Sequence, residues 1–171
     1  MNTKQILSFL SFVVFSGCTT IATYPPIEHE TARSFANSSK EPVPTIMAEA
    51  ISYTHKHFGG MDRVVFNLPQ GVDREAYSIV AKKLGDAVPM KNANEIAYHI
   101  VELRLRGFEA DADVVFPVTM GGYEMATIHL ESSIVDPWVV TNDRVWLIPT
   151  SDMLLPNYTV EEVVEVDAVE P

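Results

Sequence analysis

The residues best suited to acid–base chemistry are one histidine and four carboxylates in the second half of the chain. Each lies in a segment where apolar and polar residues alternate: Glu102, Asp111, Asp113, His129 and Glu131. Alternation puts every second side chain on one face of a strand, so these residues would share the polar face of a sheet. A histidine beside carboxylates can act as a general base, and two carboxylates can divide the acid and base roles. His129, Glu131 and Asp113 are therefore the candidate catalytic residues.

The same segments also fit a sheet face without catalysis. A two-residue turn at Gly107-Phe108, with glycine first, is typical of a β-hairpin. It predicts three facing pairs, of which two are attractive and one repulsive: Arg106 with Glu109, Arg104 with Asp111, and Glu102 with Asp113. Cross-strand ion pairs explain the acids without an active site. We therefore favour a non-catalytic binding or structural role, with a small hydrolase or other enzyme as the alternative.

No motif indicates a metal, a nucleotide or an activated nucleophile. The three candidate catalytic residues lack a diagnostic metal-ligand spacing, and His55 and His57 would lie about 200° apart around a helix. Gly71 follows a short apolar run but belongs to no GxGxxG or Walker pattern, and no GxSxG sequence occurs. We expect neither a metal nor a cofactor.

Two helices and several strands must position these residues. Residues 46–58 and 73–84 carry apolar side chains at helical spacing, and Thr45 is the expected N-cap of the first helix. Short β-branched or alternating runs predict the strands, including a last hairpin with Asn142-Asp143 as its turn, in the segments 63–68, 97–106, 109–118, 123–134 and 138–148. The predicted fold class is α+β, with two helices packed on a bent, mostly antiparallel β-sheet of about five to six strands.

Two tryptophans, Trp138 and Trp146, fall in the last predicted hairpin. Helices followed by a bent sheet with an aromatic-rich end resemble the cone-shaped NTF2-like domains in element order. That resemblance implies a small apolar ligand in a pocket lined by Trp138 and Trp146. As core residues, however, both indoles need no ligand, and we favour that interpretation. A third interpretation is an envelope protein that docks on another membrane component through the sheet or the acidic tail.

The start of the chain has the composition of an export signal. Lys4 supplies a positive charge, residues 6–15 form an apolar run, and the small residues Ser16 and Gly17 precede Cys18. The run is far shorter than the ~20 residues that a membrane-spanning helix needs, so we expect it to be removed.

This segment resembles the signal of bacterial lipoproteins, in which an aliphatic residue and two small residues precede a lipidated cysteine. Ser16, Gly17 and Cys18 match, and Phe15 stands where leucine is usual. The resemblance implies that a diacylglycerol-modified, acylated Cys18 becomes the new N-terminus and binds the lipid bilayer. Thr19, in place of aspartate, implies the outer membrane, facing the periplasm. The alternative is an ordinary secretory signal, but Cys18 is the only cysteine in the chain and cannot form an internal disulfide.

Composition limits the possible partners. The formal net charge is −11, which argues against nucleic acid and against electrostatic docking on anionic lipid. The 47% hydrophobic fraction indicates a folded body. The predicted organisation is a signal peptide at 1–17, a lipidated cysteine with a flexible tether at 18–45, one α+β domain at 46–156 and a disordered acidic tail at 157–171. A second possibility for the tether is that residues 21–27 add an edge strand to the body.

Overall fold

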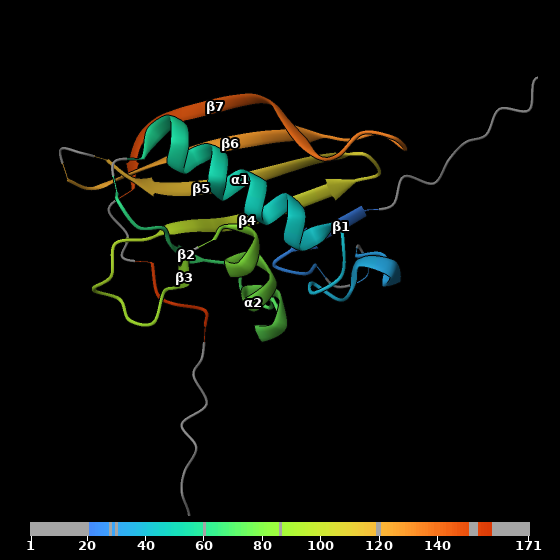
Figure 1. Cartoon of the computed structure of the whole chain (residues 1–171), viewed down its shortest axis with the longest axis horizontal. Coiled ribbons are helices and arrows are strands. Elements are labelled where there is room, and N and C mark those ends of the chain that lie inside the picture. The colour runs from blue at the N-terminus through green and yellow to red at the C-terminus, as the bar shows by residue number, and fades with distance from the viewer. Residues whose placement is uncertain are drawn as a thin grey trace, which may run out of the picture.

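The computed structural model describes residues 21–27, 29, 31–59, 61–85, 87–118, 121–150 and 154–158. The signal peptide, Cys18 and the acidic tail from residue 159 lie outside the described residues. Within them, two α-helices pack against a mostly antiparallel sheet (Figure 1), which confirms the predicted α+β class.

The sheet has seven strands, one or two more than predicted, in the order β3-β2-β4-β5-β6-β7, with β1 paired to β4. Their bounds are β1 Ile21–Tyr24, β2 Val65–Asn67, β3 Val88–Pro89, β4 Tyr98–Arg106, β5 Glu109–Pro117, β6 Tyr123–Glu131 and β7 Val139–Thr150. Strand β2 runs parallel to β3 and β4, and the long strands β4 to β7 are antiparallel. Strands β1 and β2 pair with opposite halves of β4, so the two short strands follow one another along its edge.

The register of the β4–β5 hairpin is the predicted one. Gly107 has φ +59° at the turn, a conformation that glycine adopts without steric cost. The facing pairs are Arg106 with Glu109, Arg104 with Asp111, and Glu102 with Asp113. Because side chains alternate along each strand, this register fixes which residues share a face.

The flexible tether predicted from residue 18 to residue 45 is wrong for the described part of that range. Ile21–Tyr24 forms β1, as the alternative of an edge strand anticipated, and Ala22 and Tyr24 are fully buried. The Tyr24 hydroxyl also donates a hydrogen bond to the Phe35 carbonyl of the short 3-10 helix η1 (Arg33–Phe35). Hydrogen bonding to β4 and burial of two side chains outweigh the turn-forming prolines that suggested a linker.

Helix α1 (Val43–Phe58) begins three residues earlier than predicted. Pro42 is its N-cap residue and Pro44 lies in its first turn, where a missing backbone N–H costs no hydrogen bond. Thr45 is therefore not the cap, and its hydroxyl donates to the Glu41 carboxylate at 2.5 Å. Helix α2 (Arg74–Lys83) follows Asp73 as predicted.

Helix α1 lies across one face of strands β4 to β7, which we call the inner face, and contacts α2 (Figure 1). The core between α1 and the inner face of the sheet consists of fully or almost fully buried apolar side chains, including Ile46, Met47, Ile51, Leu103, Leu105, Val114, Ile128 and Leu130. None of the described helices is both long and apolar enough to cross a membrane.

The predicted last hairpin, with a turn at Asn142-Asp143, is wrong. Residues 139–150 form the single strand β7, in which Asn142 pairs with His129 and Asp143 with Ile128. The Asp143 carboxylate points to the inner face and accepts a hydrogen bond from Tyr53 of α1 at 2.7 Å. Continuous pairing with β6 overrides the local turn preference of these two residues.

The folded body also extends beyond residue 156. Asn157 donates backbone and side-chain hydrogen bonds to Asn67 and Leu68, and Tyr158 packs against Tyr77 of α2. The disordered tail predicted to start at residue 157 is therefore wrong for residues 157 and 158.

Candidate functional site

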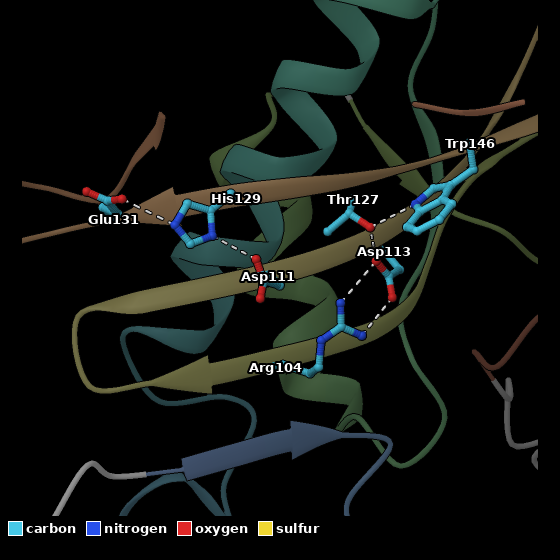
Figure 2. A network of polar contacts seen from close by, with 7 residues as sticks. All are labelled: Arg104, Asp111, Asp113, Thr127, His129, Glu131 and Trp146. Carbon is cyan, nitrogen blue, oxygen red and sulfur yellow. Dashed lines mark hydrogen bonds and ion pairs between the residues drawn. The ribbon is translucent and has the colours of Figure 1, made fainter. Parts of the chain in front are cut away.

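The candidate catalytic residues lie together on the face of the sheet opposite α1, which we call the outer face. Asp113, His129 and Glu131 occupy the positions of β5 and β6 that alternate with buried core residues. Figure 2 shows their side chains on this face, with the α1 ribbon behind the sheet. The prediction that the polar residues share one face is confirmed, and their contacts form two groups.

The first group is centred on Asp113. Its two carboxylate oxygens accept hydrogen bonds from the two terminal nitrogens of Arg104 at 2.7 and 3.1 Å. Glu102 lies 2.9 Å from the same guanidinium. The hydrogen bond with Asp113 is the main cause that raises the pKa of Arg104, so the group stays charged.

The predicted ion pair between Arg104 and Asp111 is wrong although the backbone register is right. Arg104 instead contacts Asp113, its diagonal neighbour, whose side chain is 15% exposed whereas that of Asp111 is 43% exposed. A guanidinium is long enough to reach a diagonal neighbour, and the less solvated carboxylate offers it a bidentate contact.

Thr127 joins this group to Trp146 of β7. The Thr127 hydroxyl donates to Asp113 at 2.5 Å and accepts the indole N–H of Trp146 at 3.0 Å. The Arg144 guanidinium carbon lies 4.4 Å from the centroid of the indole ring, a cation–π contact. The indole is thus fixed by Thr127 and covered by Arg144.

The second group is centred on His129. Its Nδ1 lies 2.7 Å from Asp111 and its Nε2 lies 3.2 Å from Glu131 (Figure 2). The hydrogen bond with Asp111 is the largest influence and raises the pKa of His129, while burial lowers it less and Glu131 adds to the rise. Two carboxylates can accept from the ring only if both nitrogens carry a proton, so this arrangement favours the imidazolium ion.

The two groups border an open depression of about 450 Å³ on the outer face. Its walls carry charged and polar side chains around one indole, including Arg104, Asp111, Thr127, His129, Arg144 and Trp146. Such a surface suits a polar or charged ligand, because guanidinium and carboxylate groups keep further hydrogen-bonding positions beyond those used in their internal pairs. A small apolar ligand requires an enclosed apolar pocket instead.

The two tryptophans are in different environments. Trp146 lines the depression, whereas Trp138 is not among its lining residues and packs, partly buried, against the hydrophobic core. In the described part of the chain, no group of three or more His, Cys, Asp or Glu side chains is arranged to hold a metal ion.

Thr127 and Arg144 are the site residues that the sequence did not single out. Thr127 has no distinctive motif, although alternation placed it outward. Arg144 and Trp146 are two residues apart, a spacing that puts both on one face of a strand. A hairpin with its turn at Asn142-Asp143 would keep both on one face, but only the pairing of β7 with β6 brings Arg144 opposite Thr127.

A second polar cluster lies on the same face near the start of β4. His99 is 2% exposed, and its Nδ1 is 3.4 Å from the Asn67 side-chain nitrogen. That nitrogen also donates to the Leu155 carbonyl at 2.9 Å. The Asn67 side-chain oxygen accepts from the Tyr77 hydroxyl at 3.1 Å and from the Asn157 backbone N–H at 2.9 Å. Burial lowers the pKa of His99 to about 4, so this histidine is neutral at pH 7.

The chain matches no known protein family, no curated protein and no solved structure. The resemblance to NTF2-like domains therefore remains one of element order.

Proposed function

We propose that this chain is an exported lipoprotein, anchored through Cys18 to the outer membrane and facing the periplasm, that binds a partner and catalyses no reaction. The anchoring half of the proposal comes from the order of charged, apolar and small residues before Cys18. The binding half comes from the outer face. The observation that supports it is that the polar groups there already form hydrogen bonds with one another.

The groups on the outer face that would have to do chemistry are already occupied. His129 has a carboxylate on each ring nitrogen, which leaves no free lone pair for a general base. The hydroxyl of Thr127 donates to the Asp113 carboxylate, but both oxygens of that carboxylate already accept hydrogen bonds from Arg104, so Asp113 is not free to take the proton and activate a nucleophile. A fixed array of paired charges around an indole is instead suited to recognising a polar partner, either an envelope protein or a polar small molecule.

Metabolic labelling with a palmitate analogue tests the anchor. We compare the wild-type chain with Cys18→Ser, expressed in a bacterium that processes lipoproteins. The expected result is label on the wild type and none on the variant, with the wild type sedimenting with membranes. Equal labelling of both forms, or of neither, would exclude lipidation at Cys18.

A small hydrolase remains the second candidate, because Asp111 and His129 lie 2.7 Å apart beside a depression. It predicts hydrolysis of some simple ester or phosphate ester by the wild type, with a large loss of rate in His129→Gln. The binding proposal predicts no turnover by either form. A wild-type rate that His129→Gln abolishes would replace the binding proposal with the enzymatic one.

A further inference from the structure

Four exposed apolar side chains gather at one end of the sheet. Phe108 of the β4–β5 turn is 54% exposed, and Ile134 and Val135 of the β6–β7 loop are 90% and 86% exposed. Val139, at the start of β7, is 50% exposed. We call Phe108, Ile134, Val135 and Val139 the apolar tip.

The apolar tip is one surface held by hydrogen bonds. The backbone N–H of Ser132 donates to the Phe108 carbonyl at 2.9 Å, which joins the β6–β7 loop to the β4–β5 turn. Within the loop, the Ser133 hydroxyl donates to the Asp136 carboxylate at 2.7 Å and accepts the N–H of Val135 at 3.2 Å. These bonds pair the polar groups of the loop with one another, and Ile134 and Val135 project outward.

The first described strand begins at the same end of the sheet. Ile21 pairs with Arg106, the residue directly before the Gly107-Phe108 turn, and is itself 39% exposed. Figure 1 shows the start of β1 on the same side as the β4–β5 turn and the β6–β7 loop. Only Thr19 and Thr20 separate Cys18 from Ile21, and the three residue steps between them span at most about 10 Å in an extended chain.

We infer that the apolar tip inserts into the surface of the lipid bilayer that holds the chain. This inference depends on the proposed lipidation, because a lipid on Cys18 would bring this end of the sheet to within about 10 Å of the membrane. Exposed apolar side chains next to a membrane are stabilised when they leave water. The outer face then runs along the strands away from the membrane, and its depression begins two residues beyond Glu109 and Glu131, at Asp111 and His129.

The charges beside the apolar tip specify the kind of lipid. Glu109 and Glu131 face each other at its base, both exposed; the exposed Arg106, which faces Glu109, offsets one of these charges, and the whole chain is acidic. A zwitterionic lipid surface suits this end of the molecule, because anionic headgroups would repel the remaining negative charge.

Quenching of tryptophan by brominated lipid tests the orientation. The full-length lipidated protein is reconstituted in phosphatidylcholine vesicles that contain brominated phosphatidylcholine. One variant carries Val135→Trp, in the apolar tip. The matched control carries Ile96→Trp, at a residue that is 56% exposed but lies before the first residue of β4, at the opposite end of the sheet. The wild type gives the background from Trp138 and Trp146.

The expected result is at least twofold stronger quenching, above background, for Val135→Trp than for Ile96→Trp. Equal quenching on vesicles that retain the protein overturns the inference and leaves the lipid anchor intact. If equal quenching accompanies self-association that Ile134→Ser abolishes, the apolar tip binds a second copy instead. Failure of the wild type to stay on the vesicles overturns the anchor, and the inference with it.

Discussion

His99 and His129 lie on the same face of the same sheet, and their environments shift their pKa values in opposite directions. His129 has a third of its side chain exposed, at 32%, and lies between two carboxylates that raise its pKa. His99 is 2% exposed and meets Asn67, and burial lowers its pKa to about 4. The position on the face does not decide the charge of the histidine. The neighbours do, because carboxylates stabilise the imidazolium ion and burial without a charged partner destabilises it.

The difference follows from what covers each end of the outer face. Residues 154–158 cross the His99 end, and their backbone groups bond to the Asn67 amide. The His129 end lies in the depression beside Trp146, where its side chain is 32% exposed; a second depression of about 390 Å³ borders the His99 end, but His99 itself is only 2% exposed. Under the proposed function, the buried cluster stabilises the fold and the more exposed one contacts a partner. Four predictions test that division.

The largest expected effect is at Asn67. Asn67→Ala removes an amide whose oxygen accepts two hydrogen bonds and whose nitrogen contacts two acceptors. It leaves the buried His99 ring without this partner, while the Tyr77 hydroxyl keeps its hydrogen bonds with the Leu68 backbone. We expect the free energy of unfolding to fall by about 4 kcal/mol. Urea denaturation at pH 7 measures it. Asn92→Ala is the matched control, because Asn92 is exposed and bonds only within its own loop, and its expected cost is below about 0.5 kcal/mol. Similar losses for both variants would mean that the buried bonds of Asn67 contribute no more to stability than those of an exposed loop residue.

The second effect is the response of His99 to acid. Its pKa is about 4 in the folded chain and near 6.5 when exposed, so between these values the unfolded chain binds more protons. The stability that the neutral ring contributes is complete above pH 6.5 and is lost as the pH falls toward 4. The loss is about 3 kcal/mol.

Urea midpoints from pH 7.5 to pH 4 measure this loss in the wild type and in His99→Gln. The variant still offers Asn67 a polar partner but has no titratable group at position 99. The acidic side chains of the protein contribute equally to the pH dependence of both curves, so the difference between the curves reports on His99. We predict that the difference in urea midpoint between the wild type and His99→Gln narrows or changes sign as the pH falls. Parallel curves would mean that His99 is already solvated in the folded chain.

The third effect is smaller and concerns the open cluster. Asp113→Asn removes the bidentate contact with Arg104 and weakens the acceptor of Thr127. These groups are only partly buried, so we expect a loss of about 1–2 kcal/mol in the free energy of unfolding. The near-ultraviolet circular dichroism of Trp146 should also weaken, since Thr127 holds the indole. Asp111→Asn is the control, and an effect as large as that of Asp113→Asn would show that the pairing of Asp113 with Arg104 contributes no more to stability than the pairing of Asp111 with His129.

The sequence predicts what depends on local periodicity and misses what depends on distant contacts. The register of β4 with β5 follows from strict alternation and from a glycine at the turn, which are both local signals. Strand β1 has neither, because Ala22 and Thr23 precede two prolines and the strand forms only by pairing with β4. The partner of Arg104 is missed for a related reason: the register fixes backbone neighbours, while the side chain reaches a diagonal carboxylate.

The last and smallest effect is the titration of His129. The carboxylates raise its pKa above the ordinary value of about 6.5, so its protonated form is stabilised by folding. That contribution is present below pH 6.5 and is lost as the pH rises through the folded pKa, the reverse of His99. Because the ring is a third exposed, solvent screens the effect on stability, and the ring itself is the better probe. Proton NMR of the imidazole should give a pKa above 6.5 in the wild type and a lower value in Asp111→Asn, with a smaller change in Glu131→Gln. A wild-type value below 6.5 would mean that the carboxylates do not hold the ring, which would free a nitrogen lone pair and favour the enzymatic candidate over the binding one.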